Sequence, residues 1–427
     1  MSKEVASGLF FQVSGQAFSD WPSHLLRYGR LLAPETQKTL DKCMACFMKA
    51  PRTFTGEDVV EFHLHGSPVL CDLLVRLATE AGARLARPGE FTQRAFLHGK
   101  LDLAQAESVL DLIESRTKAQ AHLAAQHLEG RFSKRIEVLR NQILGTLSLL
   151  EAEIDFGDDI DNLPETEHRR LLDRLLLEIE SLLTDAQQGR VLVQGLKTVF
   201  VGAPNAGKSS LLNACLQEDR ALVTAVAGTT RDRIDVDCQL QGILFNLTDT
   251  AGLRAETDDE VEKLGMEKTK EAVGKADFVV LVMDSHEPKL PSLEFQPDFV
   301  LLNKSDLDLR VKELKLEELF PDAIFCRGEL LTEEGREQVV EELVEAAKRQ
   351  LEKTPGECFS LNQRHRESLV RCRESLLRMS ETLERGLGAE FLALDLRRAA
   401  EALGDILGLD ITEEVLDRIF GQFCLGK

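Results

Sequence analysis

The chain has 427 residues, 43% of them hydrophobic, which is enough for two or three domains with buried cores. Its 52 basic and 73 acidic residues give a formal net charge of −21, which disfavours a broad surface for direct binding of nucleic acid. We expect a cytoplasmic protein without a membrane span, because no apolar run is long enough to cross a bilayer and no secretory leader is evident. Nine cysteines, scattered and odd in number, favour a reducing compartment over a disulfide framework.

Residues 1–105 are predicted to form a mixed α/β domain. Residues 60–65 alternate apolar and polar side chains, as a half-buried strand does, and a helical pattern follows them. Glu61, His63 and His65 fall on the polar face of that strand. Since no third ligand is evident beside the two histidines, a polar strand face is favoured over a metal site.

The short motif Cys43-x-x-Cys46 lies in the same region. It resembles a redox pair or half of a zinc site, but no second pair of cysteines accompanies it. We therefore predict two packed thiols on a helix.

Helical patterns dominate residues 101–154 and return after Pro355. Between these stretches, residues 196–351 hold short apolar runs that alternate with helical segments. We predict an α/β domain at 196–351 that is inserted into an all-α domain formed by residues 106–195 and 352–427. Such an insertion is tolerated when the two ends of the inserted domain lie close together.

The segment Gly202-Ala-Pro-Asn-Ala-Gly-Lys-Ser209 matches the phosphate-binding pattern G-x-x-x-x-G-K-[ST]. An apolar run precedes it and a helical pattern follows it, which is the strand, loop and helix order of an anion site. Lys208 can reach the outer phosphates, and the Ser209 hydroxyl can bind Mg²⁺. The predicted nucleotide-binding residues of this loop are Asn205, Ala206, Gly207, Lys208, Ser209 and Ser210.

The motif Asn303-Lys-Ser-Asp306 follows the apolar run 299–302 and indicates that the base is guanine. The Asp306 carboxylate can accept both N1–H and the exocyclic amine of guanine, whereas adenine would leave it unpaired. Asn303 and Lys304 would brace the loop. The match to the usual further base-binding segment, expected near Cys326, is poor.

Two further motifs lie between them. Asp249-Thr-Ala-Gly252 provides a carboxylate near Mg²⁺ and a Gly252 N–H for the γ-phosphate, with Thr250 and Ala251 completing the motif. The segment 228–232 supplies threonines for a first switch. The four motifs occur in the chain order of a Ras-like GTPase, which implies a Ras-like α/β fold.

Leu253 stands where Ras-like enzymes have a glutamine that orients water. Leucine cannot do this, and neither Arg231 nor Arg254 is an evident arginine finger. The amide oxygen of Asn205, with oxygens from residues 224–229, is a candidate site for a monovalent cation such as K⁺.

The chain resembles the MnmE (TrmE) family of tRNA-modification GTPases over nearly all of its length. Besides the GTPase motifs, the resemblance rests on Phe54-Thr-Gly-Glu-Asp-Val-Val-Glu61, Arg87-Pro-Gly-Glu-Phe-Thr-Gln-Arg-Ala-Phe96, Gly99-Lys-Leu-Asp-Leu-Ala-Gln-Ala-Glu107, Ile154-Asp-Phe156 and Phe423-Cys-Leu-Gly-Lys427. By this resemblance, the K⁺ ligands are Asn205, Thr224, the Val226 backbone and Thr229, and the Mg²⁺ ligands are Ser209 and Thr230. The resemblance also gives catalytic roles to Lys208, to Glu262 as the water-orienting carboxylate, and to Cys424.

The resemblance implies a K⁺-dependent GTPase that works as a homodimer with the FAD protein MnmG, which would hold most of the tRNA. The pair would modify the wobble uridine of tRNA at carbon 5, with a carboxymethylaminomethyl or aminomethyl group. The N-terminal domain would mediate dimerisation and bind 5-formyltetrahydrofolate or a related one-carbon tetrahydrofolate. The implied folate contacts are Glu61, Lys100 and Lys427.

Two alternatives remain open. Ribosome-assembly GTPases such as Era or Der share the loop asparagine and the missing glutamine, but they explain neither Cys424 nor the motifs of residues 1–105. A regulator that hydrolyses GTP without folate chemistry is favoured by Gln12, which stands at the family's arginine position.

Overall fold

The computed structural model describes residues 6, 9–12, 21–33, 35–156, 164–218, 235–249, 269–286, 290, 295–305, 315–352, 359, 361–409, 411–424 and 426. It divides into two compact units, which are described separately. One unit holds Met1–Ile113, Gln126–Glu165 and Arg378–Lys427, and the other holds Glu114–Ala125 and Thr166–Leu377. The domain limits expected from the sequence stay a prediction.

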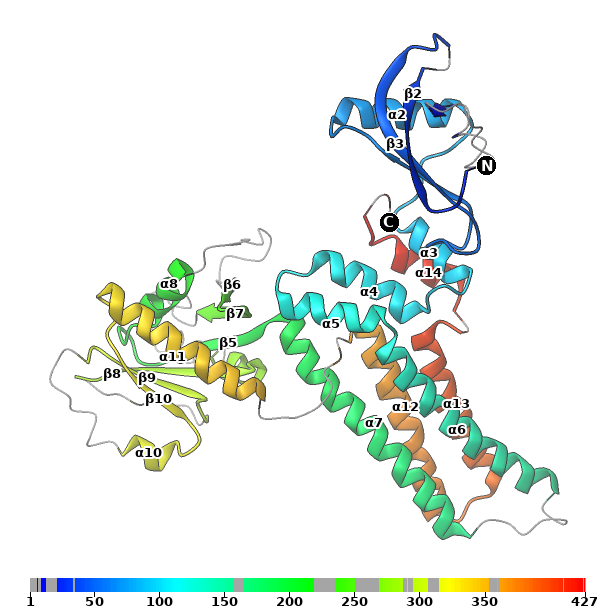
Figure 1. The fold of residues 1–427 in the computed structure, drawn as a ribbon. Coiled ribbons are helices and arrows are strands. Elements are labelled where there is room, and N and C mark those ends of the chain that lie inside the picture. Colours follow the sequence, from blue (N-terminus) through cyan, green and yellow to red (C-terminus); the bar gives the residue numbers. More distant parts are fainter. Residues whose placement is uncertain are drawn as a thin grey trace. The chain divides into compact units, whose positions relative to one another are not determined.

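A four-stranded antiparallel sheet that packs with helix α2 forms the N-terminal part of the first unit (Figure 1). Its elements are β1 (Phe10–Gln12), β2 (Leu25–Leu32), β3 (Thr39–Met48), β4 (Val59–His63) and α2 (Pro68–Glu80). Alternate residues of β3 point inward, so Cys43, Ala45 and Phe47 join Leu31 and Leu77 in one core with α2. The predicted strand is confirmed, although it ends at His63 rather than at residue 65.

Cys43 and Cys46 lie on β3, so their predicted placement on a helix is wrong. A spacing of three residues puts two side chains on one face of a helix but on opposite faces of a strand. Cys43 accordingly faces the core, whereas Cys46 is paired across the sheet with Leu26 and Glu61. Both thiols are buried.

Helices make up the rest of the first unit. They are α3 (Glu90–Leu97), α4 (Leu103–Glu114), α6 (Arg131–Phe156), α13 (Ala389–Leu407) and α14 (Glu413–Phe420). The buried stripes of α6 and α13 face each other, and Arg397 pairs with Glu151 across them at 2.7 Å. The apolar face of α14 packs with Phe96, Leu103 and Ala106.

The second unit contains a six-stranded sheet of order β10-β9-β8-β5-β7-β6, parallel except for β6. The strands are β5 (Leu196–Val201), β6 (Asp235–Leu240), β7 (Ile243–Asp249), β8 (Phe278–Asp284), β9 (Phe299–Asn303) and β10 (Ile324–Arg327). The helices of this unit include α7 (Glu165–Gln194), α8 (Lys208–Glu218), α10 (Leu316–Leu319) and α11 (Glu333–Glu352). Helices α5 (Lys118–Leu128) and α12 (Gln363–Glu384) belong in part to each unit. The predicted strand before the phosphate loop is confirmed as β5, and the apolar run 299–302 lies in β9.

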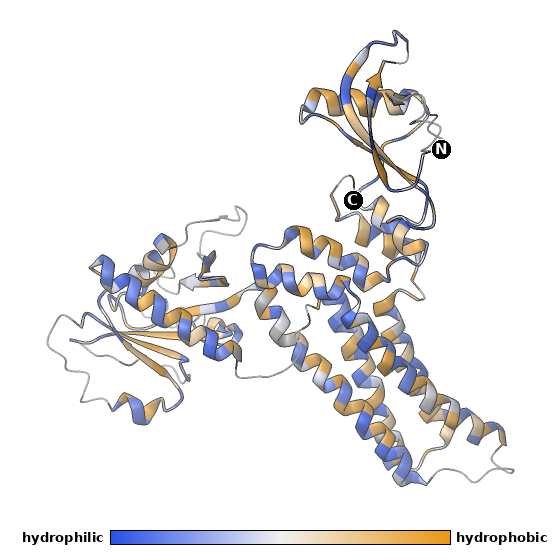
Figure 2. Cartoon of the chain, viewed as in Figure 1, coloured by the Kyte–Doolittle hydropathy of each residue, from blue (hydrophilic) through white to orange (hydrophobic). Residues whose placement is uncertain are grey.

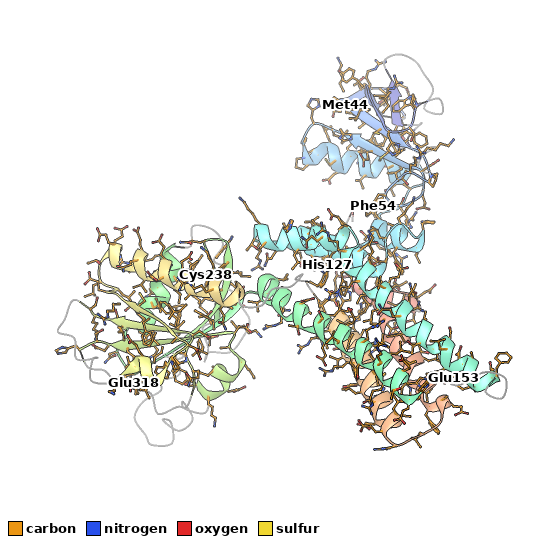
Figure 3. All side chains as sticks on the ribbon, turned by 60° about the horizontal axis from the view of Figure 1, so that its bottom comes forward. Met44, Phe54, His127, Glu153, Cys238 and Glu318 are labelled. Atoms are coloured by element: carbon orange, nitrogen blue, oxygen red, sulfur yellow. The ribbon has the colours of Figure 1, made fainter. Side chains whose placement is uncertain are left out.

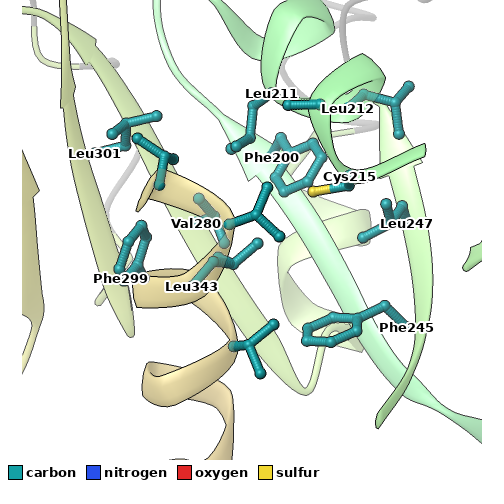
Figure 4. Packing of buried hydrophobic residues seen from close by; sticks show 14 of the residues in the cluster. Phe200, Leu211, Leu212, Cys215, Phe245, Leu247, Val280, Phe299, Leu301 and Leu343 are labelled. Atoms are coloured by element: carbon teal, nitrogen blue, oxygen red, sulfur yellow. The ribbon is translucent and has the colours of Figure 1, made fainter. Parts of the chain in front are cut away.

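Helices α8 and α11 cover one face of this sheet. Phe200 and Phe245 from the sheet, Leu211 from α8 and Leu343 from α11 share one buried cluster (Figure 4). Figure 2 shows β8 and β9 hydrophobic along most of their length, and α11 with separate polar and apolar sides. Continuous apolar strands of this kind are typical of a parallel sheet that is covered on both faces. The molecule therefore has the expected class, a Ras-like α/β domain with an all-α part and an N-terminal α/β sheet.

In the part of the chain that the structure describes, no helix has the length and apolar content needed to cross a membrane.

Candidate functional site

The phosphate loop joins β5 to α8 with the backbone that its two glycines permit. Gly207 has a φ of +112°, and a Cβ on it would lie 2.1 Å from Asn303 Nδ2. Asn205 also has a left-handed backbone, with a φ of +58°, and its side chain is exposed. The loop is thus closed by backbone, with room at residue 207 for glycine alone.

Lys208, the first residue of α8, is buried. Its Nζ donates hydrogen bonds to the carbonyl oxygens of Gly202, at 2.8 Å, and Ala203, at 2.9 Å. The ammonium therefore lies against the loop itself, where it can meet an anion held by the loop and the start of α8. Ser209 and Ser210 follow it and are exposed.

Asn303 connects the phosphate loop with the predicted guanine motif. It ends β9 and is 4% exposed, and its Nδ2 donates to the Ala206 carbonyl oxygen at 2.8 Å. Its Oδ1 has no hydrogen-bond partner among the described residues. A buried acceptor left in this state costs free energy unless a donor reaches it, so the position fits a ligand with N–H groups.

Lys304 follows with a left-handed backbone, and its Nζ pairs with Asp284 Oδ2 at 2.6 Å. Asp284 ends β8, the parallel neighbour of β9, so the two residues meet at one edge of the sheet. This ion pair joins Lys304 to the end of β8, and the role of Lys304 in bracing a guanine-binding loop stays a prediction.

The segment after β10 lies beside the same loop. The Ser305 N–H donates to the Gly328 carbonyl oxygen at 3.3 Å, and the Gly328 N–H donates to Leu302 at 3.2 Å. Cys326 is buried in the strand before it, and burial raises the pKa of its thiol to about 11. Although its residues match poorly, the segment occupies the neighbourhood expected for a base-binding loop.

Several predicted residues lie outside the described part of the chain. These are Thr224, Val226, Thr229, Thr230, Thr250, Ala251, Gly252, Glu262, Asp306 and Lys427. Asp249 ends β7, so its backbone is placed at the same sheet edge. The structure thus brings Asn205, Lys208 and Asn303 into one neighbourhood and leaves the switch residues as predictions.

The predicted folate residues lie in the first unit. Glu61 is on the exposed side of β4, and its Oε2 is 3.6 Å from His63 Nε2. Lys100 Nζ donates to the Pro51 carbonyl oxygen in the loop between β3 and β4. Among the residues that the structure describes, no hydrogen bond or ion pair joins Glu61 to Lys100.

Histidine 65 is not beside His63 in a ligand pair. The ring Nδ1 of His65 lies 2.7 Å from Asp41 Oδ1, and the backbone N–H of His65 donates to Asp41 Oδ2. Within the described ranges, no group of three or more His, Cys, Asp or Glu side chains is arranged to hold a metal ion.

Sequence reasoning missed an ion-pair cluster at the start of α3. Arg84 and Arg94 both bind the buried Glu90 carboxylate, and the Arg87 N–H donates to it at 2.8 Å. These contacts, Arg84 first, hold the pKa of Glu90 far below its usual range although burial raises it. The spacing of Glu90 and Arg94 suits a helical ion pair and was the available signal, whereas Arg84 had none.

The predicted catalytic Cys424 follows α14 and is exposed, with its carbonyl oxygen 3.5 Å from the Gly89 nitrogen. The other described exposed cysteine is Cys71 on α2. Figure 3 shows the side chains of both units, with Met44 on β3 and Cys238 on β6 among those labelled.

Comparison with known proteins places the chain in a family. The model of the MnmE helical domain matches residues 103–424, and that of the GTP-binding protein TrmE N-terminus matches residues 2–100. The chain is 38% identical to the tRNA modification GTPase MnmE of Geobacillus kaustophilus over 99% of this chain and 94% of that protein. It is 40% identical to the protein of the same name from Heliobacterium modesticaldum, over 100% of this chain and 94% of the relative.

Among solved structures, the G domain of the T. maritima FeoB iron transporter is 24% identical, with a TM-score of 0.26, over 36% of this chain and 98% of that one. The two family models together with full-length relatives near 40% identity show that this chain belongs to the MnmE family of tRNA modification GTPases.

Proposed function

We propose that the chain binds and hydrolyses GTP and that this hydrolysis serves the modification of tRNA. The observation that carries the proposal is the Asn303 hydrogen bond to Ala206, because it joins a phosphate loop to a guanine-type motif in one site. The family membership supports the same activity.

In this proposal Lys208 binds the outer phosphates, backbone N–H groups from Ala206 to Ser210 surround them, and Asp306 selects guanine. Ser209 and Thr230 would hold Mg²⁺, with Asp249 near it. Asn205, Thr224, Val226 and Thr229 would hold K⁺. Asn205 fits this role because its amide is exposed on the loop itself.

When bound, the two cations supply positive charge that offsets the charge of the phosphates during hydrolysis. Glu262 would orient the attacking water, a task for which Leu253 has no polar group. In the motif Asp249-Thr-Ala-Gly252, the Gly252 N–H would meet the γ-phosphate, with Thr250 and Ala251 completing the motif.

The test of this site compares GTP hydrolysis in KCl and NaCl for the wild type and for Asn205→Ala. We expect faster hydrolysis in KCl, and we expect the variant to lose that preference. Asn213→Ala is the matched control, since Asn213 is exposed on α8 away from the loop turn. Equal wild-type rates in both salts contradict the role of K⁺, and a Lys208→Ala variant with full activity contradicts the site.

We also propose that the chain acts with the FAD protein MnmG on carbon 5 of the wobble uridine. The net charge of −21 supports a division of labour in which the partner holds most of the tRNA. Mass analysis of tRNA nucleosides from cells that lack the gene should show loss of the aminomethyl-type group, restored by the wild type but not by Lys208→Ala. Co-sedimentation with ribosomes in place of MnmG capture would instead favour a ribosome-assembly switch.

The N-terminal sheet is proposed to bind a one-carbon tetrahydrofolate through Glu61, Lys100 and Lys427, and to form the homodimer. The exposed position of Glu61 on β4 supports its availability to a ligand. Titration with 5-formyltetrahydrofolate should show binding that Glu61→Gln weakens. The control Glu80→Gln changes an exposed side chain of α2 and should leave binding unchanged. No binding by the wild type would favour the regulator without folate chemistry.

A further proposal is that two chains associate through their Ras-like domains, residues 196–351, at the face that carries the first switch, residues 228–232. Sedimentation with GDP, aluminium fluoride and K⁺ should show a heavier species than in Na⁺. A single species in both salts would contradict it.

A further inference from the structure

The first residue before α3 touches the last helical turn of the chain through its backbone. Gly89 has a φ of +66°, and a Cβ built on it would lie 2.6 Å from the Phe420 carbonyl oxygen and 3.0 Å from Phe420 Cβ. The Gly89 nitrogen also faces the Cys424 carbonyl oxygen at 3.5 Å. A side chain at residue 89 would therefore separate α3 from the segment that carries Cys424.

The segment that carries Cys424, residues 420–424, is held by packing between aromatic rings. Phe420 is 1% exposed and Phe423 is 5% exposed, and their ring centres lie 5.5 Å apart. Phe96 of α3 contributes a third ring, 6.4 Å from that of Phe420. Cys424 follows directly after this packed pair and is itself exposed. The Cys424 thiol therefore directly follows a backbone segment that is held in place by packing.

The other side of Gly89 is fixed by the Glu90 cluster. The Glu90 side chain is 6% exposed and pairs with Arg84 and with Arg94, the latter at 2.7 Å. It also accepts the Arg87 N–H at 2.8 Å, which closes the turn that contains Gly89. The left-handed turn is thus clamped from within the first unit and has little freedom to move away from Phe420.

We propose that Gly89 is a positioning residue for Cys424: the close backbone contact with Phe420, clamped by Glu90, sets where the thiol is presented to the tRNA-modifying reaction. This rests on the proposed function in tRNA modification and on the catalytic role that the family resemblance gives to Cys424. The required feature is the absence of a side chain at residue 89, which the nucleotide site proposed above does not need.

The test uses Gly89→Ala in the full chain, with Gly99→Ala as its matched control. Gly99 follows the same helix and has a φ of +63°, but a Cβ on it would meet nothing within 4 Å. The two variants therefore share the backbone strain and differ in the contact with Phe420. Amide hydrogen exchange in residues 421–424 should be about tenfold faster in Gly89→Ala and unchanged in Gly99→Ala.

In the same variants, tRNA modification should fall about tenfold in Gly89→Ala while GTP hydrolysis stays within about twofold of the wild type, because the contact lies outside the nucleotide site. Gly89→Asn separates strain from contact, since asparagine accepts a left-handed backbone but still carries a Cβ. Recovery of exchange and modification by Asn would overturn the proposal.

Cys424→Ser tells this inference apart from the proposed function. If Cys424→Ser abolishes modification while Gly89→Ala matches the wild type in exchange and modification, the positioning role is wrong and the function stands. If Cys424→Ser leaves modification intact, the role of Cys424 is wrong and the inference falls with it. Should Gly89→Ala not fold, Phe420→Leu replaces it, with faster exchange and weaker modification expected and wild-type behaviour contradicting the proposal.

Discussion

The six-stranded sheet and the four-stranded sheet bury their strands in different ways. Every residue of β9 is buried, as is nearly all of β8, because helices and loops cover both faces. In the smaller sheet, the face toward α2 is buried, whereas the other face buries Cys46 but leaves Leu26, Tyr28 and Met44 52%, 53% and 47% exposed.

This difference decides where each sheet can carry chemistry. A sheet that is filled on both faces has no free face, so its functional groups gather where strands end, as Lys208 and Asn303 do after β5 and in β9. A sheet with one free face can present residues along the strand itself, as Glu61 is presented on β4.

Phe200→Ala should have the largest effect, because Phe200 is 0% exposed at the centre of the six-stranded sheet. Deleting such a ring costs about 3–5 kcal/mol of unfolding free energy. Denaturation followed by circular dichroism should show an earlier transition. Trp21, the single tryptophan, is buried in the core of the smaller sheet, so its fluorescence transition should move little. A joint shift of both signals would mean that the two sheets unfold together.

Cysteine reactivity offers a second comparison of the two sheets, because the smaller sheet contains the buried Cys43 and the six-stranded sheet the buried Cys326. Burial raises the pKa of Cys43 and that of Cys326 to about 11 in both cases. At pH 8 about 0.1% of such a thiol is ionised, and only the thiolate reacts. Alkylation followed by peptide mass analysis should therefore label exposed Cys71 and Cys424 about a hundredfold faster than either buried thiol. Rapid labelling of Cys43 alone would show that the smaller sheet opens readily.

Glu90→Gln should destabilise the first unit by about 2 kcal/mol at pH 7, since it weakens charged hydrogen bonds to a buried group. The folded-state pKa of Glu90 is lowered from the usual 4.5, so its contribution is present above that value and is lost as pH falls below it. The Tm difference between wild type and variant should shrink from pH 7 to pH 3.

Glu57→Gln is the control for this variant, because Glu57 also pairs with Arg94 but has a side chain that is 40% exposed. Its effect should stay below about 1 kcal/mol. If the Tm difference between wild type and Glu90→Gln does not depend on pH, the charge of Glu90 is not the source of the stability that this cluster provides.

The elements that sequence predicted well are those with local signals. Strand β5 and the phosphate loop form one continuous segment, so an apolar run, two glycines and a helix start were enough to place them. The helix predicted for Cys43 and Cys46 was wrong because polar and apolar residues do not alternate regularly along β3: the charged Asp41 is buried on the core side. That carboxylate is satisfied by His65, 24 residues away, and no local pattern announces such a partner.

The site shows the same limit. Local patterns predicted the phosphate loop and the strand end at Asn303 separately, but the hydrogen bond from Asn303 to Ala206 spans 97 residues and depends on the order of the strands. The contact of Gly89 with Phe420 is more remote still, because a glycine required by a close backbone approach looks in sequence like any turn glycine.

Leu26→Thr should have the smallest effect. The side chain lies on the more exposed face of β2, and threonine has the β-branched shape that strands favour, so unfolding free energy should change by no more than about 0.5 kcal/mol. The measurement is the Trp21 transition in denaturant, recorded at two protein concentrations. A loss above about 1.5 kcal/mol that depends on concentration would mean that a second copy covers this face in solution, and the contrast between a filled and a half-open sheet would then apply to the monomer alone.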